Sequence, residues 1–231
     1  MNQHNTDILK AIQGGLVVSC QALPEEPLHS SFIMSRMALA AQMGGAVGIR
    51  ANTVEDIEEI RKTVNLPIIG IIKSVYPDSE VYITPTMKEI DALMQCGVEI
   101  LAMDATNRTR PYGQNLSQFF AEVRRIYPEQ LFMADCSSPE EGMAAAEMGF
   151  DIIGTTMAGY TSYTKGRTVP PFDMIDCLVK NCGRSVIAEG NIGTPEQLKT
   201  ALDLGVHCAV VGAAITRPLE ITKKFTAVIK Q

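Results

Sequence analysis

Two titratable side chains follow apolar segments and could transfer protons. Lys73 follows the run Pro67-Ile-Ile-Gly-Ile-Ile72, and Glu189 follows Val186-Ile-Ala188. Partial burial lowers the pKa of a lysine and can make its amine a usable base. A carbon held between the two groups could lose a proton to one and gain a proton from the other on the opposite face. That arrangement would invert an acidic C–H centre, although a structural Lys–Glu ion pair is an alternative interpretation.

Other apolar runs along the chain also end at hydrogen-bonding side chains. These residues are Gln21, Arg50, Asp104, Asp135 and Thr155. Any one of them could be a capping or solvated residue. As a set that follows successive predicted strands, they indicate that polar groups converge on one face of the fold.

Two glycine-containing segments near the C-terminus could bind an anion. Residues 189–194 read Glu-Gly-Asn-Ile-Gly-Thr, and residues 211–216 read Val-Gly-Ala-Ala-Ile-Thr. Glycine lets backbone N–H groups approach an anion closely, and a helix N-terminus adds a favourable dipole. Arg217 could add a charge-assisted hydrogen bond. Two such loops in succession predict a phosphate site.

The elements that must position these residues follow a regular order of strand and helix. The predicted strands are residues 15–20, 46–49, 67–72, 99–103, 131–134, 151–153, 185–188 and 208–211, and the predicted helices include residues 54–63, 87–96, 116–126, 139–148 and 195–204. Several strands are continuously apolar, which suits strands buried on both faces of a parallel sheet. We therefore predict a single (β/α)8 barrel spanning residues 1–231, with the active site at the C-terminal ends of the strands.

An internal repeat supports the barrel. Thr86, Ser138 and Thr194 are each followed eleven residues later by a glycine, and each glycine precedes an apolar run. A Ser or Thr that caps a helix N-terminus and a glycine that ends the helix explain this spacing. Two longer segments, residues 76–86 and 155–169, interrupt the regular order, and loops of such length are usually functional.

The composition limits the function further. Of 231 residues, 46% are hydrophobic and 20% are charged, with a net charge of -6, which argues against binding to nucleic acid. No apolar run approaches the length of a membrane span, and residues 1–10 lack the apolar region of a signal peptide. The six cysteines are scattered without zinc-site spacing, so we expect no metal and reduced thiols in a cytoplasmic protein.

Together these motifs resemble the N-acetylmannosamine-6-phosphate 2-epimerase family of sialic-acid catabolism. The matching segments are Ser19-Cys-Gln-Ala22, Gly48-Ile-Arg50, Ile71-Ile-Lys73, residues 76–86, Asp104-Ala-Thr106, Met133-Ala-Asp-Cys-Ser137, Gly159-Tyr-Thr161, Ala188-Glu-Gly-Asn-Ile192 and Val211-Gly-Ala213. They occur in order over nearly the whole chain.

The resemblance implies an isomerase that interconverts N-acetylmannosamine 6-phosphate and N-acetylglucosamine 6-phosphate at C2, without a cofactor, as a homodimer. It implies that Lys73 is the base and Glu189 the acid. The other implied site residues bind the substrate: Gln21, Arg50 and Asp135 orient the sugar, and Gly190, Asn191, Gly212, Ala213 and Arg217 hold the phosphate. The residues alone leave two alternatives open, a barrel enzyme in which Lys73 forms a Schiff base and a phosphosugar-binding module without catalysis.

Overall fold

A closed barrel of eight parallel strands forms the centre of the molecule, in a computed structural model that describes residues 2–229. The strands are β1 (Leu16–Cys20), β2 (Gly48–Asn52), β3 (Ile68–Ile71), β4 (Ile100–Asp104), β5 (Leu131–Asp135), β6 (Ile152–Gly154), β7 (Ser185–Glu189) and β8 (Cys208–Val211). Each strand pairs with the next, and β8 pairs with β1 to close the ring. The predicted (β/α)8 barrel is confirmed.

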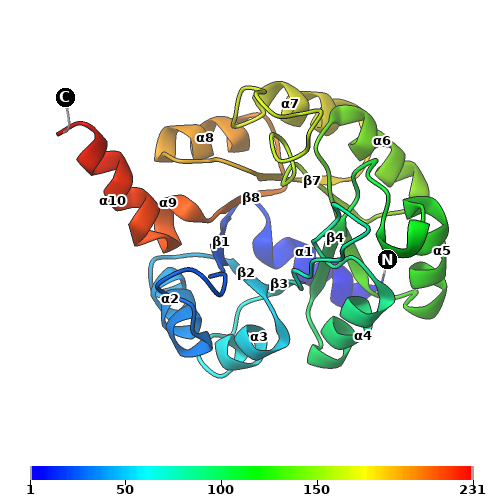
Figure 1. Cartoon of the computed structure of the whole chain (residues 1–231), viewed down its shortest axis with the longest axis horizontal. Helices are drawn as coiled ribbons and strands as arrows, with labels where there is room; N and C mark the ends of the chain where they lie inside the picture. Colours follow the sequence, from blue (N-terminus) through cyan, green and yellow to red (C-terminus); the bar gives the residue numbers. More distant parts are fainter. Residues whose placement is uncertain (1, 230–231) are drawn as a thin grey trace.

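Helices surround the barrel (Figure 1). They are α1 (Gln3–Ile12), α2 (Ser31–Met43), α3 (Val54–Arg61), α4 (Met87–Cys96), α5 (Leu116–Ile126), α6 (Pro139–Met148), α7 (Phe172–Asn181), α8 (Pro195–Asp203), α9 (Ala213–Thr216) and α10 (Pro218–Ala227), with a short 3₁₀ turn, η1, at Pro111–Gly113. One buried apolar cluster joins the helices to the outer faces of the strands. A second cluster fills the barrel interior.

Helix α1 covers the lower mouth of the barrel, where the strands begin. Ile8, Leu9 and Ile12 of this helix pack into the interior cluster. His207, which precedes β8, approaches the carbonyl of Leu9 with Nε2 at 2.8 Å. The interior is therefore closed by side chains from below, and His207 lies away from the strand ends that face the upper mouth.

The predicted helix caps explain the regular spacing in the sequence. The Ser138 hydroxyl accepts from Glu141 N–H, and the Thr194 hydroxyl accepts from Gln197 N–H. Thr86 and Glu89 form a reciprocal capping box at the start of α4. Gly97 ends α4 with φ 65°, a left-handed conformation that favours glycine.

Residues 72–84, which include most of the long loop predicted at residues 76–86, fold back as an extension of β3. Lys73 and Ile83 form an antiparallel bridge. Ser74 N–H donates to the Tyr82 carbonyl at 2.9 Å, and Thr84 N–H donates to the Ile72 carbonyl at 2.7 Å. We call residues 72–84 the β3 hairpin. The hairpin and β2 together hold the backbone of Lys73 from two sides, because Lys73 pairs with Ile83 and its N–H donates to Asn52 Oδ1 of β2 at 2.8 Å.

A buried arginine fastens the β3 hairpin to the end of β4. The Arg110 side chain is almost fully buried and donates to the carbonyls of Thr84, Pro85 and Asp104. Its guanidinium also stacks over the Phe119 ring, 4.5 Å from the centroid. Burial lowers the pKa of Arg110 to about 10, and the three carbonyl oxygens supply the acceptors that a buried guanidinium needs.

Candidate active site

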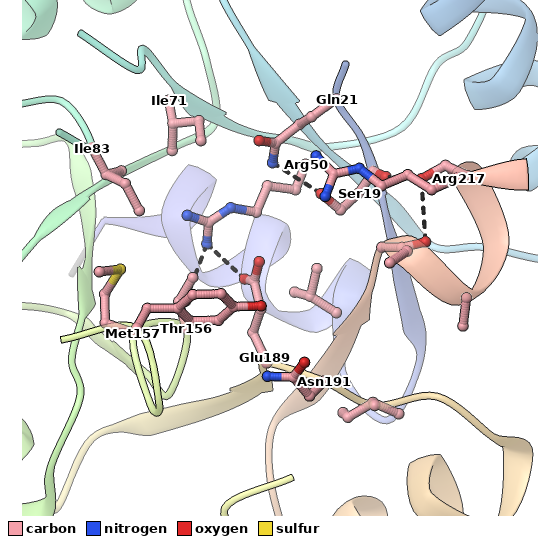
Figure 2. A pocket seen from close by; sticks show the side chains of 18 of the residues that line it. Ser19, Gln21, Arg50, Ile71, Ile83, Thr156, Met157, Glu189, Asn191 and Arg217 are labelled. Carbon is pink, nitrogen blue, oxygen red and sulfur yellow. Dashed lines mark hydrogen bonds and ion pairs between the residues drawn. The ribbon is translucent and has the colours of Figure 1, made fainter. Parts of the chain in front are cut away.

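A cavity of about 250 Å³ opens at the upper mouth of the barrel (Figure 2). Its walls come from the ends of β1, β2, β3, β7 and β8 and from the loops that follow the strands. Nine of the ten predicted site residues line it: Gln21, Arg50, Lys73, Glu189, Gly190, Asn191, Gly212, Ala213 and Arg217. The strand ends bring together residues that are far apart in the sequence, as the barrel geometry requires.

Asp135, the tenth predicted residue, lies behind the cavity wall. Its carboxylate is fully buried and accepts two hydrogen bonds from Arg50, at 3.1 and 2.5 Å. The hydroxyl of Thr156 donates to the same carboxylate at 2.6 Å. Asp135 therefore positions Arg50 in this structure, and direct contact of Asp135 with a substrate stays a prediction.

Arg50 links the fully buried carboxylate of Asp135 to the mostly buried carboxylate of Glu189. Its Nη1 lies 2.6 Å from Glu189, and its Nη2 lies 2.5 Å from Asp135. Although burial opposes the charge of Arg50, these two carboxylates raise its pKa, so the guanidinium stays protonated. The Arg50 Nε is buried without a hydrogen-bond partner among residues 2–229. This N–H is therefore unsatisfied in the structure described.

Lys73 extends into the cavity from just beyond β3. Burial lowers its pKa to about 8, and the positive charges of Arg50 and Arg217 act in the same direction. In the described part of the chain its amine makes no hydrogen bond or ion pair with another residue. A lysine with these properties is partly neutral near pH 7 to 8 and can accept a proton.

Glu189 ends β7 beside Lys73 in the same cavity. Burial raises its pKa to about 7, while the Arg50 charge opposes that rise. Glu189 N–H donates to the Thr155 hydroxyl at 3.0 Å, and this hydroxyl donates to the Glu189 carbonyl at 2.8 Å. Its carboxylate pairs with Arg50, and the ion pairs of residues 2–229 include none between Lys73 and Glu189. A static Lys–Glu ion pair therefore does not explain the two side chains.

The two glycine-containing loops, which follow β7 and β8, form one end of the cavity. Gly190 has φ 114° and Asn191 has φ 59°, so the chain makes a left-handed turn directly after Glu189. A Cβ on Gly190 would meet the Thr155 carbonyl oxygen at 3.3 Å, which favours glycine there. Gly212 precedes the short helix α9. The turns leave backbone groups of both loops along the cavity wall.

Two cations lie at this end, and the sequence pointed to only one of them. Arg217 forms two contacts with Glu26, Nε to Oε1 at 2.9 Å and Nη2 to Oε2 at 3.0 Å. Lys224 of α10 also lines the cavity, with its Nζ 3.6 Å from the position a Cβ would take on Gly193. An exposed lysine on the last helix carries no sequence signal, since only the fold brings it to the site.

Side chains from the two long loops complete the cavity. Tyr82 of the β3 hairpin lines it, as do Met157 and Tyr160 from the loop after β6. The loops were predicted to be functional and the family-like segments contain Tyr82 and Tyr160, but none of the three residues was predicted as a site residue. Within residues 2–229, no group of three or more His, Cys, Asp or Glu side chains has the arrangement of a metal site.

Comparison with known proteins identifies the family. The family described as "Putative N-acetylmannosamine-6-phosphate epimerase" matches residues 34–231. Two relatives named "Putative N-acetylmannosamine-6-phosphate 2-epimerase", from Clostridium perfringens strain SM101 and Borrelia garinii subsp. bavariensis, are each 54% identical to the chain. The first match covers 96% of the chain and 100% of the relative, and the second covers 97% and 98%. The chain belongs to the N-acetylmannosamine-6-phosphate epimerase family.

Solved structures agree with this family. The structure of the N-acetylmannosamine-6-phosphate 2-epimerase from Clostridium perfringens superimposes with a TM-score of 0.91 at 53% identity, covering 96% of each chain. A thiamine phosphate pyrophosphorylase from Pyrococcus furiosus, at 15% identity and a TM-score of 0.60, shares the fold alone. The predicted family and its enzyme class, an isomerase acting as an epimerase, are confirmed.

No helix of the described residues is both long and apolar enough to cross a membrane.

Proposed function

We propose that this epimerase interconverts N-acetylmannosamine 6-phosphate and N-acetylglucosamine 6-phosphate, and that Lys73 and Glu189 carry the proton transfer. The observation that supports the proposal best is the pair itself. Two titratable groups, with pKa values moved to about 8 and about 7, line one cavity without pairing with each other. Such displaced values are typical of acid–base catalysts.

The first step removes the C2 proton. The neutral amine of Lys73 accepts that proton, and the electron pair of the C–H bond moves toward the C1 carbonyl of the open-chain sugar. This carbonyl is what makes the C2 proton acidic, so the reacting form of the sugar is the open chain. We infer that the charged guanidinium of Arg50, which lines the cavity, stabilises the oxygen on which negative charge develops.

The second step returns a proton to C2 on the opposite face. Protonated Glu189 gives up its proton, the C2–H bond forms, and the C1 carbonyl is restored. The resulting carboxylate is stabilised by Arg50 at 2.6 Å, which Asp135 holds in place from behind. The reverse reaction uses the same groups with exchanged roles, because Lys73 is then the acid and Glu189 the base.

The glycine-containing loops and the nearby cations suit the phosphate. We infer that backbone groups of Gly190, Asn191, Gly212 and Ala213 surround it and that Arg217 donates to it. Glu26 holds Arg217 at two points and thereby limits the positions its guanidinium can take. Lys224 supplies a second positive charge. Gln21, fixed by a 2.9 Å hydrogen bond to Ser19, is placed to orient the sugar.

Turnover in deuterated water tests the proposal. The product should carry deuterium at C2, detected by NMR, because the proton that Glu189 delivers comes from solvent. A product that keeps its original hydrogen throughout would contradict the two-sided scheme. Borohydride reduction during turnover examines the Schiff-base alternative, since a stable adduct on Lys73 would assign the lysine a covalent role.

We also infer a homodimer of single-domain barrels in the cytoplasm. Helix α10 has no buried residue, and Leu219, Phe225, Val228 and Ile229 at and beyond it are exposed. Apolar side chains grouped on one terminal segment suit burial against a second copy of the chain. The six cysteines are free, which suits a reducing compartment.

A further inference from the structure

The cavity has a charged end and an apolar end (Figure 2). Arg217 and Asn191 lie at the charged end, beside the glycine-containing loops. Ile71, Ile83 and Met157 lie at the other end. Arg50 and Glu189 stand between the two ends, so a ligand that spans the cavity passes the reacting groups at its middle.

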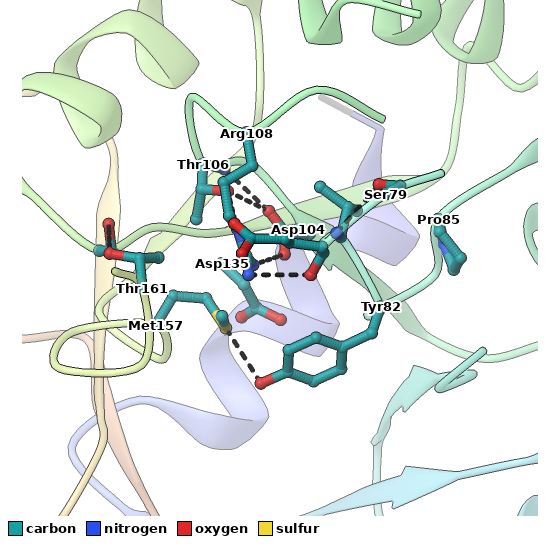
Figure 3. Close-up of polar contacts among 12 residues, drawn as sticks. Ser79, Tyr82, Pro85, Asp104, Thr106, Arg108, Asp135, Met157 and Thr161 are labelled. Atoms are coloured by element: carbon teal, nitrogen blue, oxygen red, sulfur yellow. Dashed lines mark hydrogen bonds and ion pairs between the residues drawn. The ribbon is translucent and has the colours of Figure 1, made fainter. Parts of the chain in front are cut away.

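The apolar end is closed by a tyrosine and a methionine that come from different loops (Figure 3). The Tyr82 hydroxyl points to the Met157 sulfur at 3.7 Å. Met157 is 1% exposed and Ile83 is 3% exposed, so their side chains are held firmly by their neighbours. We call Tyr82, Ile83 and Met157 the apolar wall.

Arg108 braces this wall from outside the cavity. Its guanidinium lies over the Tyr82 ring, 5.8 Å from the centroid. The same group pairs with the buried Asp104 at 2.5 Å and donates to the Glu80 carbonyl at 2.9 Å. The ring of Tyr82 is thus tied to β4 and to the β3 hairpin, and the wall cannot retreat without breaking these contacts.

The proposed function sets the direction in which the sugar lies. With the phosphate on C6 at the charged end and C2 between Lys73 and Glu189, C1 and the acylamino group on C2 lie at the end of the sugar that is far from the phosphate. Both therefore lie on the side of the apolar end, and the acyl group is the apolar one of the two. An acyl methyl group gains free energy when it leaves water for such a surface.

We propose that the apolar wall binds the N-acyl group of the substrate and limits its length. This inference rests on the proposed function. The methyl group of an acetyl substituent would face Ile83 and Met157, and the amide would lie near the Tyr82 hydroxyl. Among residues 2–229 that hydroxyl has one hydrogen-bond partner, the weakly accepting Met157 sulfur, so it can bond an amide group instead.

The test compares two substrates, the 6-phosphates of N-acetylmannosamine and N-butanoylmannosamine. The measured quantity is the ratio of their kcat/KM values, butanoyl over acetyl. The wild-type ratio should be low, because the buried and braced wall opposes two further methylene groups. Met157→Ala should raise the ratio about 10-fold or more, since one methylene in an apolar pocket is worth about 10- to 200-fold in specificity.

Tyr82→Ala removes the other side of the wall and should act in the same direction. Its half-buried side chain makes this variant a safeguard should Met157→Ala fold poorly. Val210→Ala is the matched control, because it removes side-chain volume elsewhere on the cavity lining. The control should leave the ratio unchanged, and melting curves should show folded protein for each variant compared.

Two results would overturn the inference alone: an unchanged ratio in the folded wall variants, or an equal rise in Val210→Ala. In both cases normal wild-type turnover of the acetyl substrate would keep the proposed function intact. Absence of any wild-type turnover would instead overturn the proposed function, and the inference with it.

Discussion

The Arg50 guanidinium pairs with two carboxylates, those of Asp135 and Glu189, which differ in their access to the cavity. Arg50 holds Asp135, which is fully buried, and Glu189, which keeps 12% of its side chain exposed. Because Asp135 lies behind the wall, Glu189 is the carboxylate that can meet a substrate. Asp135 keeps Arg50 in place, so the guanidinium need not reorganise when charge develops nearby.

Replacing the two proposed proton carriers should abolish turnover without unfolding the protein. Lys73→Met keeps most of the side-chain length, and Glu189→Gln keeps the shape. Each should lower kcat about 100-fold or more, the usual scale for a positioned acid or base. Melting temperature should change little, or rise, because a partly buried charge is removed. Paired kcat and melting measurements decide this, and stable variants with near-normal turnover would refute both roles.

The pH dependence of kcat/KM should be bell-shaped, with limbs near pH 7 and pH 8. Below about pH 7 both Glu189 and Lys73 are protonated and no base is present. Above about pH 8 both are deprotonated and no acid is present. Activity requires the pair to hold one proton, so it peaks between the limbs. Initial rates from pH 5.5 to about 9.5 measure this, and a flat profile would contradict the assignment.

The sequence was sufficient for those site residues that follow buried strands. Lys73, Arg50 and Glu189 could be predicted because a strand end in a parallel barrel has a known position relative to the active face. Glu26 and Lys224 could not, since their places depend on how a loop and the last helix pack. The sequence also placed β2 too early, so Arg50 lies within that strand instead of after it.

The helices could be predicted from nearby residues, whereas the β3 hairpin depends on contacts between residues farther apart in the sequence. Helices α4, α5 and α6 begin and end at the predicted residues, because the residues that cap them lie directly next to them in the sequence. The β3 hairpin escaped prediction. Its pairing joins residues about ten positions apart, and it is fastened by Arg110 from a different loop.

Removing that fastening should weaken both the fold and the reaction. Arg110→Met leaves the carbonyls of Thr84, Pro85 and Asp104 without their donor. We expect the free energy of unfolding to fall by about 2–4 kcal/mol in urea titrations. In the folded fraction kcat should also fall about 10-fold or more, because the hairpin positions Lys73.

Arg125→Met is the control for this prediction, since Arg125 is an exposed arginine of α5. It should leave both stability and kcat nearly unchanged. An Arg110→Met variant as stable and active as this control would show that the hairpin holds its position without the arginine.

At the scale of the whole molecule, residues 215–229 carry a group of exposed apolar side chains on one projecting segment. Figure 1 shows α10 projecting from the rim of the barrel beside α9. Phe225 is 71% exposed and Val228 is 73% exposed. The same helix brings Lys224 to the cavity. Contacts that hold α10 in place therefore also hold Lys224 at the end of the cavity that we propose binds the phosphate.

Charge placed on this helix should separate the proposed dimer. Light scattering after size exclusion should give twice the chain mass for the wild type and the chain mass for Phe225→Lys, because a buried, unpaired charge opposes association. Val75→Lys is the control, since Val75 is exposed on the β3 hairpin and far from α10 in sequence. A wild-type mass equal to one chain would contradict the dimer.

The closure of the lower mouth by α1 determines the route by which the substrate enters and the product leaves. Ile8, Leu9 and Ile12 occupy the space through which a second channel would run. A sugar phosphate that arrives through the upper mouth has to depart by the same route. The two epimers therefore use the same entrance, and a bound molecule of one epimer prevents binding of the other. We therefore expect accumulated product to slow turnover by competing with the substrate for the single entrance and cavity.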